Sequence, residues 1–91
     1  MKFANEKELQ IVVYPNPAKS DFTLSINNAD NKQADIVVFD PLGKLVAQRK
    51  VNLATGENST HFDSDEWPRG IYHIRIIIDE ADSFENTVIL N

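Results

Sequence analysis

The sequence predicts an all-β domain, an antiparallel sandwich of about seven strands. Hydrophobic residues recur at every second position in short runs, as expected for strands that bury one face. Turn residues separate these runs, and no stretch keeps the helical period over three turns. A chain of 91 residues is large enough for one domain and too small for two.

The first strands show the period most clearly. Phe22, Leu24 and Ile26 alternate with Thr23 and Ser25, so the three hydrophobic residues should face the core and the two polar ones water. Similar runs end in turn residues along the whole chain. The seven strands are predicted at residues 9–14, 22–26, 34–39, 44–51, 59–62, 71–78 and 83–90.

The longest of these strands, 71–78, has Tyr72, Ile74, Ile76 and Ile78 on one face. Polar segments without a hydrophobic period are predicted loops, at residues 27–33, 52–58 and 79–82. The hydrophobic period begins only at Leu9. We therefore predict a linker at residues 1–8 and one domain at 9–91.

Two turn motifs support these boundaries. Pro15 and Pro17 have no amide donor, so the chain must leave the ladder of the first strand there, and that strand should lie at a sheet edge. Asp40-Pro41-Leu42-Gly43 has the residues of a type I turn, with Gly43 able to take the left-handed conformation. The second motif predicts a bulged hairpin.

Composition argues against several functions. The net charge is −5 and the lysines and arginines are scattered, so no nucleic-acid surface is predicted. The absence of cysteine excludes disulfides, thiolate metal sites and a cysteine nucleophile. No run is apolar enough for a signal peptide or a membrane span.

No residue cluster has the spacing of a catalytic or metal site. His61 and His73 lie on the polar faces of different strands without a third ligand. The acidic residues around 63–66 and 79–82 lack the glycine and the distal glutamate of a calcium loop. We predict no catalytic, cofactor or metal site, and no enzyme activity.

Several short motifs follow one another in order along the chain. Tyr-Pro-Asn-Pro precedes an alternating strand, the aspartate-glycine turn ends in a lysine, a Gly-x-Asn step follows, and Trp67 leads into Gly-Ile-Tyr and the longest strand. The motif residues are Tyr14, Pro15, Asn16, Pro17, Asp40, Gly43, Lys44, Gly56, Asn58, Gly70 and Tyr72. In this order and spacing the chain resembles the C-terminal sorting domain of type IX (Por) secretion system cargo proteins of Bacteroidetes.

The chain departs from that family in two places. Trp67 stands where leucine is more usual, and the terminal strand carries no lysine. The resemblance implies an immunoglobulin-like sandwich at the end of a larger cargo protein. It also implies that the type IX translocon recognises the domain and that a sortase-like peptidase removes it, here within residues 3–9. The protein would pass through the periplasm and reach the outer-membrane surface or the medium.

In that family the C-terminal strands carry much of the recognition, which corresponds here to residues 70–90. The side chains that we nominate for translocon contact are Ile74, Ile76, Ile78, Val88 and Leu90. From the sequence itself we predict no cofactor, no nucleic-acid partner and no direct membrane span.

An accessory binding module is the alternative function. Such an immunoglobulin-like module would bind carbohydrate or protein through exposed aromatic side chains such as Trp67 or Phe84. We favour burial of Trp67 beside Tyr72, at the end of the sandwich. Exposed rings would favour the alternative.

Overall fold

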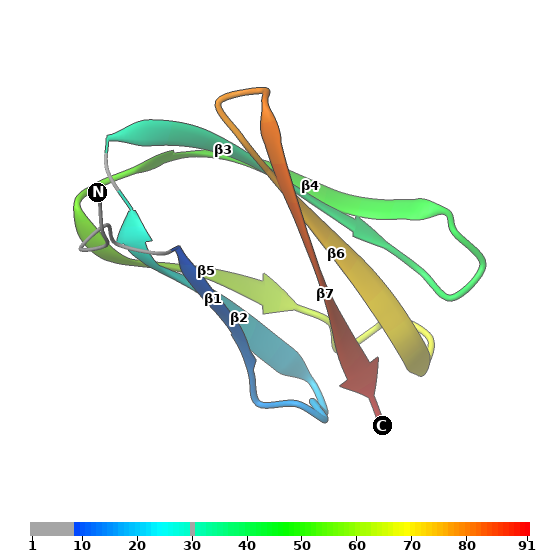
Figure 1. Cartoon of the computed structure of the whole chain (residues 1–91). Coiled ribbons are helices and arrows are strands. Elements are labelled where there is room, and N and C mark those ends of the chain that lie inside the picture. The colour runs from blue at the N-terminus through cyan, green and yellow to red at the C-terminus, as the bar shows by residue number, and fades with distance from the viewer. Residues whose placement is uncertain (1–8, 30) are drawn as a thin grey trace.

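Two antiparallel sheets packed face to face make up the protein, in a computed structural model that describes residues 9–29 and 31–91 (Figure 1). The strands are β1 (Gln10–Tyr14), β2 (Asp21–Ala29), β3 (Lys32–Phe39), β4 (Leu45–Leu53), β5 (Gly56–Asp63), β6 (Gly70–Ile78) and β7 (Asp82–Leu90). The sheet orders are β1-β2-β5 and β4-β3-β6-β7. The predicted all-β sandwich of seven strands is confirmed.

The core lies between the sheets and is filled by alternate residues of the facing strands. Phe22, Leu24 and Ile26 from β2 are buried, as the alternation predicts. Phe22 stacks on Phe62 of β5, with 5.1 Å between ring centroids. Removal of such apolar side chains from water is the main force that holds two sheets together.

Ser25 differs from its prediction. It points to the outer face of β2, yet it is only 6% exposed. Its hydroxyl donates to the Glu57 carboxylate at 3.3 Å, which satisfies this buried polar group.

The two polar segments predicted as loops, 27–33 and 52–58, are mostly strand. Ala29 pairs with Gly56 and Lys32 pairs with Leu53, so β2 and β4 extend into these segments and β3 and β5 begin within them. The prediction was wrong because main-chain pairing between neighbouring strands does not depend on hydrophobic side chains. At this end of the molecule both β2–β3 and β4–β5 pass from one sheet to the other (Figure 1).

The edge position of β1 is confirmed, since β1 pairs only with β2 in the three-stranded sheet. Strand β7 is an edge strand of the four-stranded sheet. Within residues 9–29 and 31–91, no helix has the length and hydrophobicity needed to cross a bilayer.

Candidate functional site at the end of the terminal strand

The first motif and the last strand meet in space. After Tyr14 the chain leaves β1 and crosses to the edge of β7, where Ala18 forms a parallel bridge with Leu90. The Ala18 amide donates to the Ile89 carbonyl at 2.7 Å, and the Asn91 amide donates to the Ala18 carbonyl at 2.9 Å. The proline-rich segment therefore pairs with the final residues of the chain.

Asn16 extends this pairing through its side chain. Its Nδ2 donates to the Thr87 carbonyl at 3.1 Å, and its Oδ1 accepts from the Ile89 amide at 3.0 Å. A carboxamide offers a donor and an acceptor side by side, as a peptide group does. Asn16 thus takes the place of a neighbouring strand residue along the edge of β7.

Arg69 is the second side chain at the end of β7, and sequence reasoning missed it. Its guanidinium donates to the Asn91 carbonyl at 3.2 Å and to the Ser64 carbonyl at 2.8 Å. The remaining acceptors are the carbonyls of Lys19, Asp65 and Trp67. The only signal in the sequence was its position just before Gly-Ile-Tyr. The convergence of five carbonyls comes from the tertiary fold.

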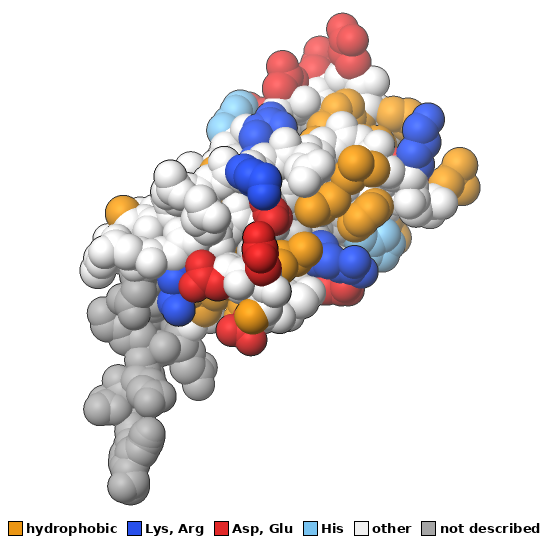
Figure 2. Space-filling view, turned by 90° about the horizontal axis from the view of Figure 1, so that it is seen from above, with side chains coloured by type: hydrophobic (Ala, Val, Ile, Leu, Met, Phe, Trp, Pro, Cys, Tyr) orange, Lys and Arg blue, Asp and Glu red, His pale blue; other side chains and the backbone are white. Residues whose placement is uncertain are grey.

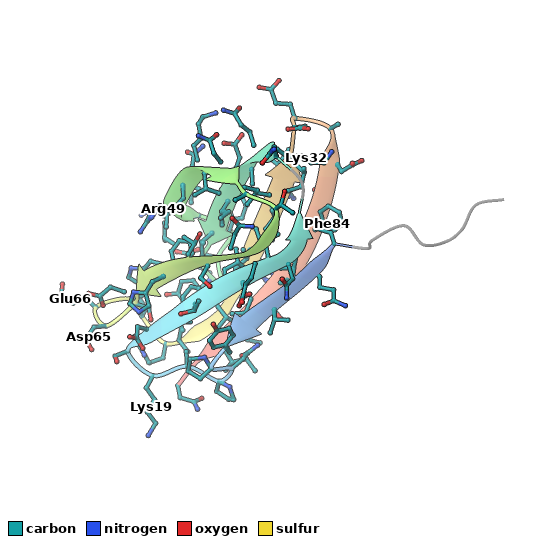
Figure 3. All side chains as sticks on the ribbon, turned by 90° about the vertical axis from the view of Figure 1, so that its left-hand side faces the viewer. Lys19, Lys32, Arg49, Asp65, Glu66 and Phe84 are labelled. Carbon is teal, nitrogen blue, oxygen red and sulfur yellow. The ribbon has the colours of Figure 1, made fainter. Side chains whose placement is uncertain are left out.

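The Lys19 side chain takes no part in this contact. It projects away from the sandwich into solvent, and Lys19 contributes its carbonyl (Figure 3). We call the group formed by Asn16, Ala18, Arg69 and residues 87–91 the terminal clamp.

Beside the clamp, three aromatic rings close the end of the sandwich. Tyr72 is fully buried and stacks on Trp67 at 5.4 Å, while Trp67 meets Phe22 edge-on at 6.1 Å. The Tyr72 hydroxyl donates to the Pro68 carbonyl, four residues upstream. A buried tyrosine that bonds back to the chain just before its own strand is a feature of immunoglobulin-like sandwiches. Burial, with a smaller contribution from the Asp40 carboxylate, raises the pKa of Tyr72 above 10.0.

The turn before β4 has the predicted chemistry. The Asp40 carboxylate accepts from the amides of Leu42 and Lys44, at 2.9 and 2.8 Å, and Gly43 has φ of 87°. The register shifts between β3 and β4 next to the turn, so the bulged hairpin is confirmed. A Cβ on Gly70 would lie 2.8 Å from Pro41, which shows that this turn packs against the start of β6.

The Gly-x-Asn step closes the turn between β4 and β5. Asn58 Oδ1 accepts from the Ala54 amide at 2.9 Å, and Nδ2 donates to the Ala54 carbonyl at 2.9 Å. Gly56 has φ of 100°, which favours glycine. The Asn58 carboxamide, like that of Asn16, replaces main-chain partners, and it does so at the other end of the sandwich (Figure 1).

The five side chains nominated for translocon contact face the core. None is more than 4% exposed, because strand alternation puts them on the inner faces of β6 and β7. They are Ile74, Ile76, Ile78, Val88 and Leu90. In the folded domain they hold the strands together, and a partner cannot reach them.

The opposite faces of β6 and β7 reach solvent. Ile71 is 50% exposed and its cross-strand partner Ile89 is 41% exposed. On this face Arg75 pairs with Glu85 at 3.1 Å. Figure 2, which is seen from above relative to Figure 1, shows hydrophobic side chains gathered next to lysines and arginines on one face of the molecule. The outer faces of β6 and β7 thus carry both hydrophobic and charged side chains.

The residues weighed for catalysis or metal binding have other contacts. His61 lies 2.9 Å from Asp21, and both are exposed on the outer face of the three-stranded sheet. Asp79 accepts from the Gln33 amide at 3.0 Å. Asp65 and Glu66 project outward from the molecule (Figure 3). Among residues 9–29 and 31–91, no three His, Cys, Asp or Glu side chains are grouped as metal ligands.

The aromatic side chains of the alternative function do not form a platform. Trp67 and Phe84 are each half-buried and packed against the core. The position of Trp67 beside Tyr72 is the one that the sequence predicted. The structure therefore gives the accessory-module hypothesis no flat aromatic surface at these two residues.

Comparison with known proteins identifies the family. A family model described as "Secretion system C-terminal sorting domain" matches residues 12–91, which is nearly the whole chain. The chain belongs to this family. The sorting domain is a C-terminal signal of type IX secretion, and proteins that carry it are exported.

A relative places the sorting domain in a larger protein. The ulvan lyase NLR42 of Nonlabens ulvanivorans is 34% identical over 80 residues, which cover 87% of this chain and 14% of the lyase. The chain thus spans about one seventh of the length of this relative. The sorting-domain family itself is not catalytic.

Proposed function

We propose that this domain directs a cargo polypeptide, attached before β1, through the type IX translocon of the outer membrane. The match to the sorting-domain family over residues 12–91 carries the proposal. The small share of the lyase that the domain covers supports it, since a signal occupies a minor part of the protein that it exports. The translocon and the N-terminal cargo domain are its proposed partners.

Removal of the domain after export is part of the proposal. A sortase-like peptidase would cut within residues 3–9, of which the structure describes Leu9, directly before β1. A peptidase needs an extended backbone outside the packed sheets, and Leu9 directly precedes β1, an edge strand.

Recognition of the folded domain would use the outer faces of β6 and β7. The buried isoleucines cannot be touched without unfolding, whereas Ile71 and Ile89 are about half exposed. Mixed surfaces with half-exposed aliphatic residues among charged side chains are common in protein interfaces. Recognition is thus still proposed for β6 and β7, but through their outer faces instead of the inner faces that the sequence analysis nominated.

A reporter fusion tests the proposed function. Residues 3–91 are fused behind a periplasmic reporter in a type IX-competent bacterium and in a strain that lacks the translocon. We expect the reporter at the cell surface or in the medium in the first strain, and in the periplasm in the second. Retention in the periplasm of both strains would overturn the proposal. Mass spectrometry of the exported reporter then locates the cut, which we expect between residues 3 and 9.

A further inference from the structure

Two side chains of the terminal clamp contact the last strand through its main chain. Asn16 bonds to the Thr87 carbonyl and the Ile89 amide, and Arg69 bonds to the Asn91 carbonyl. These contacts fix where the strand lies without depending on which side chains it carries. In sequence, Asn16 lies 71 and 73 residues from its two partners, and Arg69 lies 22 residues from Asn91.

An edge strand needs such contacts on its unpaired side. Strand β7 has β6 on one side, and its other side would expose main-chain donors and acceptors. Bonds from other segments satisfy these groups and hold the strand in place. The Ala18 bridge and the two side chains supply these contacts at residues 87–91.

We propose that Asn16 and Arg69 are positioning residues of the sorting signal, which clamp residues 87–91 in the conformation that the translocon meets. This inference rests on the proposed function. It assigns a role to the asparagine of the Tyr-Pro-Asn-Pro segment, whose prolines only end β1. It also links the segment nearest the cargo to the strand farthest from it.

The side-chain chemistry at each position is specific. Alanine at position 16 would lose both the donor and the acceptor, and aspartate would keep the acceptor but turn a negative oxygen toward the Thr87 carbonyl. At position 69, lysine would keep the charge but lose the planar fork that reaches several carbonyls at once. Graded loss across these variants is therefore expected.

Hydrogen exchange of the purified chain tests the clamp itself. In Asn16→Ala we expect the Ile89 amide to exchange on the order of tenfold faster, since it loses its acceptor. The matched control is Asn58→Ala, which removes a carboxamide with the same kind of main-chain bonds near Ala54, at the other end of the sandwich. This control should leave exchange at Ile89 unchanged.

Export of the reporter fusion tests the positioning role. We expect Asn16→Ala and Arg69→Lys to lower the exported fraction several-fold, and Asn58→Ala to export like the wild type. Equal export of Asn16→Ala and wild type would overturn the inference. So would an equal loss in Asn16→Ala and Asn58→Ala, because that would show dependence on general stability alone.

The two proposals fail in different ways. If the wild-type fusion stays in the periplasm of both strains, the sorting function fails, and the positioning role fails with it. If the wild type is exported and Asn16→Ala and Arg69→Lys are exported to the same extent, the sorting function stands and the positioning role fails. Should Asn16→Ala not fold, Asn16→Asp serves in both measurements, with the same expected direction.

Discussion

Single polar side chains in this domain often replace main-chain groups. Asn16 does so at the edge of β7 and Asn58 at the turn before β5, while the Asp40 carboxylate accepts two amides in the hairpin turn. Short side chains of this kind satisfy main-chain groups that a sheet would otherwise leave unpaired. At the scale of the residue, these motif residues therefore serve mainly to satisfy main-chain hydrogen bonds.

Tyr72 links stability to pH. Because its folded pKa lies above the 10.0 of the unfolded chain, the neutral form is favoured in the fold. The stabilisation is fully present below about pH 10 and is lost as the pH rises through the folded pKa. We expect urea denaturation to show this loss in the wild type and not in Tyr72→Phe. At pH 7 the variant should lose about 1 kcal/mol, from its hydrogen bond to Pro68. An unchanged alkaline loss in Tyr72→Phe would contradict this assignment.

Gly70 is required by close packing as well as by its backbone. Its φ is 147°, and an added Cβ would lie 2.8 Å from Pro41. We expect Gly70→Ala to lower the free energy of unfolding by about 2–4 kcal/mol, since backbone strain and a steric clash add. Gly43→Ala is the matched control, because its φ is 87° but nothing lies within 4 Å of the added atom. A smaller loss in Gly70→Ala than in Gly43→Ala, measured by urea titration, would refute the packing argument.

At the scale of the element, the sequence predicted the phase of each strand better than its length. The inner faces of β2 and β6 follow directly from the alternation at Phe22 and at Tyr72. The extension of β2 to Ala29 could not be predicted, because it depends on the partner strand β5. Alternation also predicted which residues of β6 share a face. The structure then showed which of the two faces is buried and which one a partner can reach.

The two faces of β6 give an element-level prediction. We expect Ile71→Ser, on the outer face, to lower export of the reporter fusion several-fold, because the translocon is proposed to bind there. Val12→Ser is the control, with 52% exposure against 50% for Ile71 but on the three-stranded sheet. Both changes should alter the free energy of unfolding by less than about 1 kcal/mol. Equal export of the two variants would exclude a role for the outer face at Ile71.

At the scale of the whole molecule, sheet order and long-range contacts decide the architecture. The sequence indicated a sandwich, and family resemblance indicated the immunoglobulin-like type. The meeting of residues 14–18 with β7 was not predictable, because the separation of 71 to 73 residues between Asn16 and its partners carries no local signal. Arg69 was missed for a related reason. Its acceptors on Lys19 and Asn91 lie 50 and 22 residues away and reach it only through the tertiary fold.

The shared core implies that the domain unfolds as one unit. Trp67 lies at the clamp end, whereas main-chain structure is spread over both sheets. We expect urea transitions followed by Trp67 fluorescence and by far-ultraviolet circular dichroism to coincide. An earlier fluorescence transition would show instead that the clamp end opens before the rest.

The parallel bridge between Ala18 and Leu90 also gives the domain a direction. Strands β1 and β7 run the same way, so β1 begins towards one end of the sandwich and β7 ends towards the other (Figure 1). Strand β1 itself, with five residues, is about 16 Å long. In the proposed function, a translocon that holds the terminal clamp would therefore leave the start of β1 free for the peptidase. We would then expect the peptidase to release the cargo while the sorting domain is still bound to the translocon.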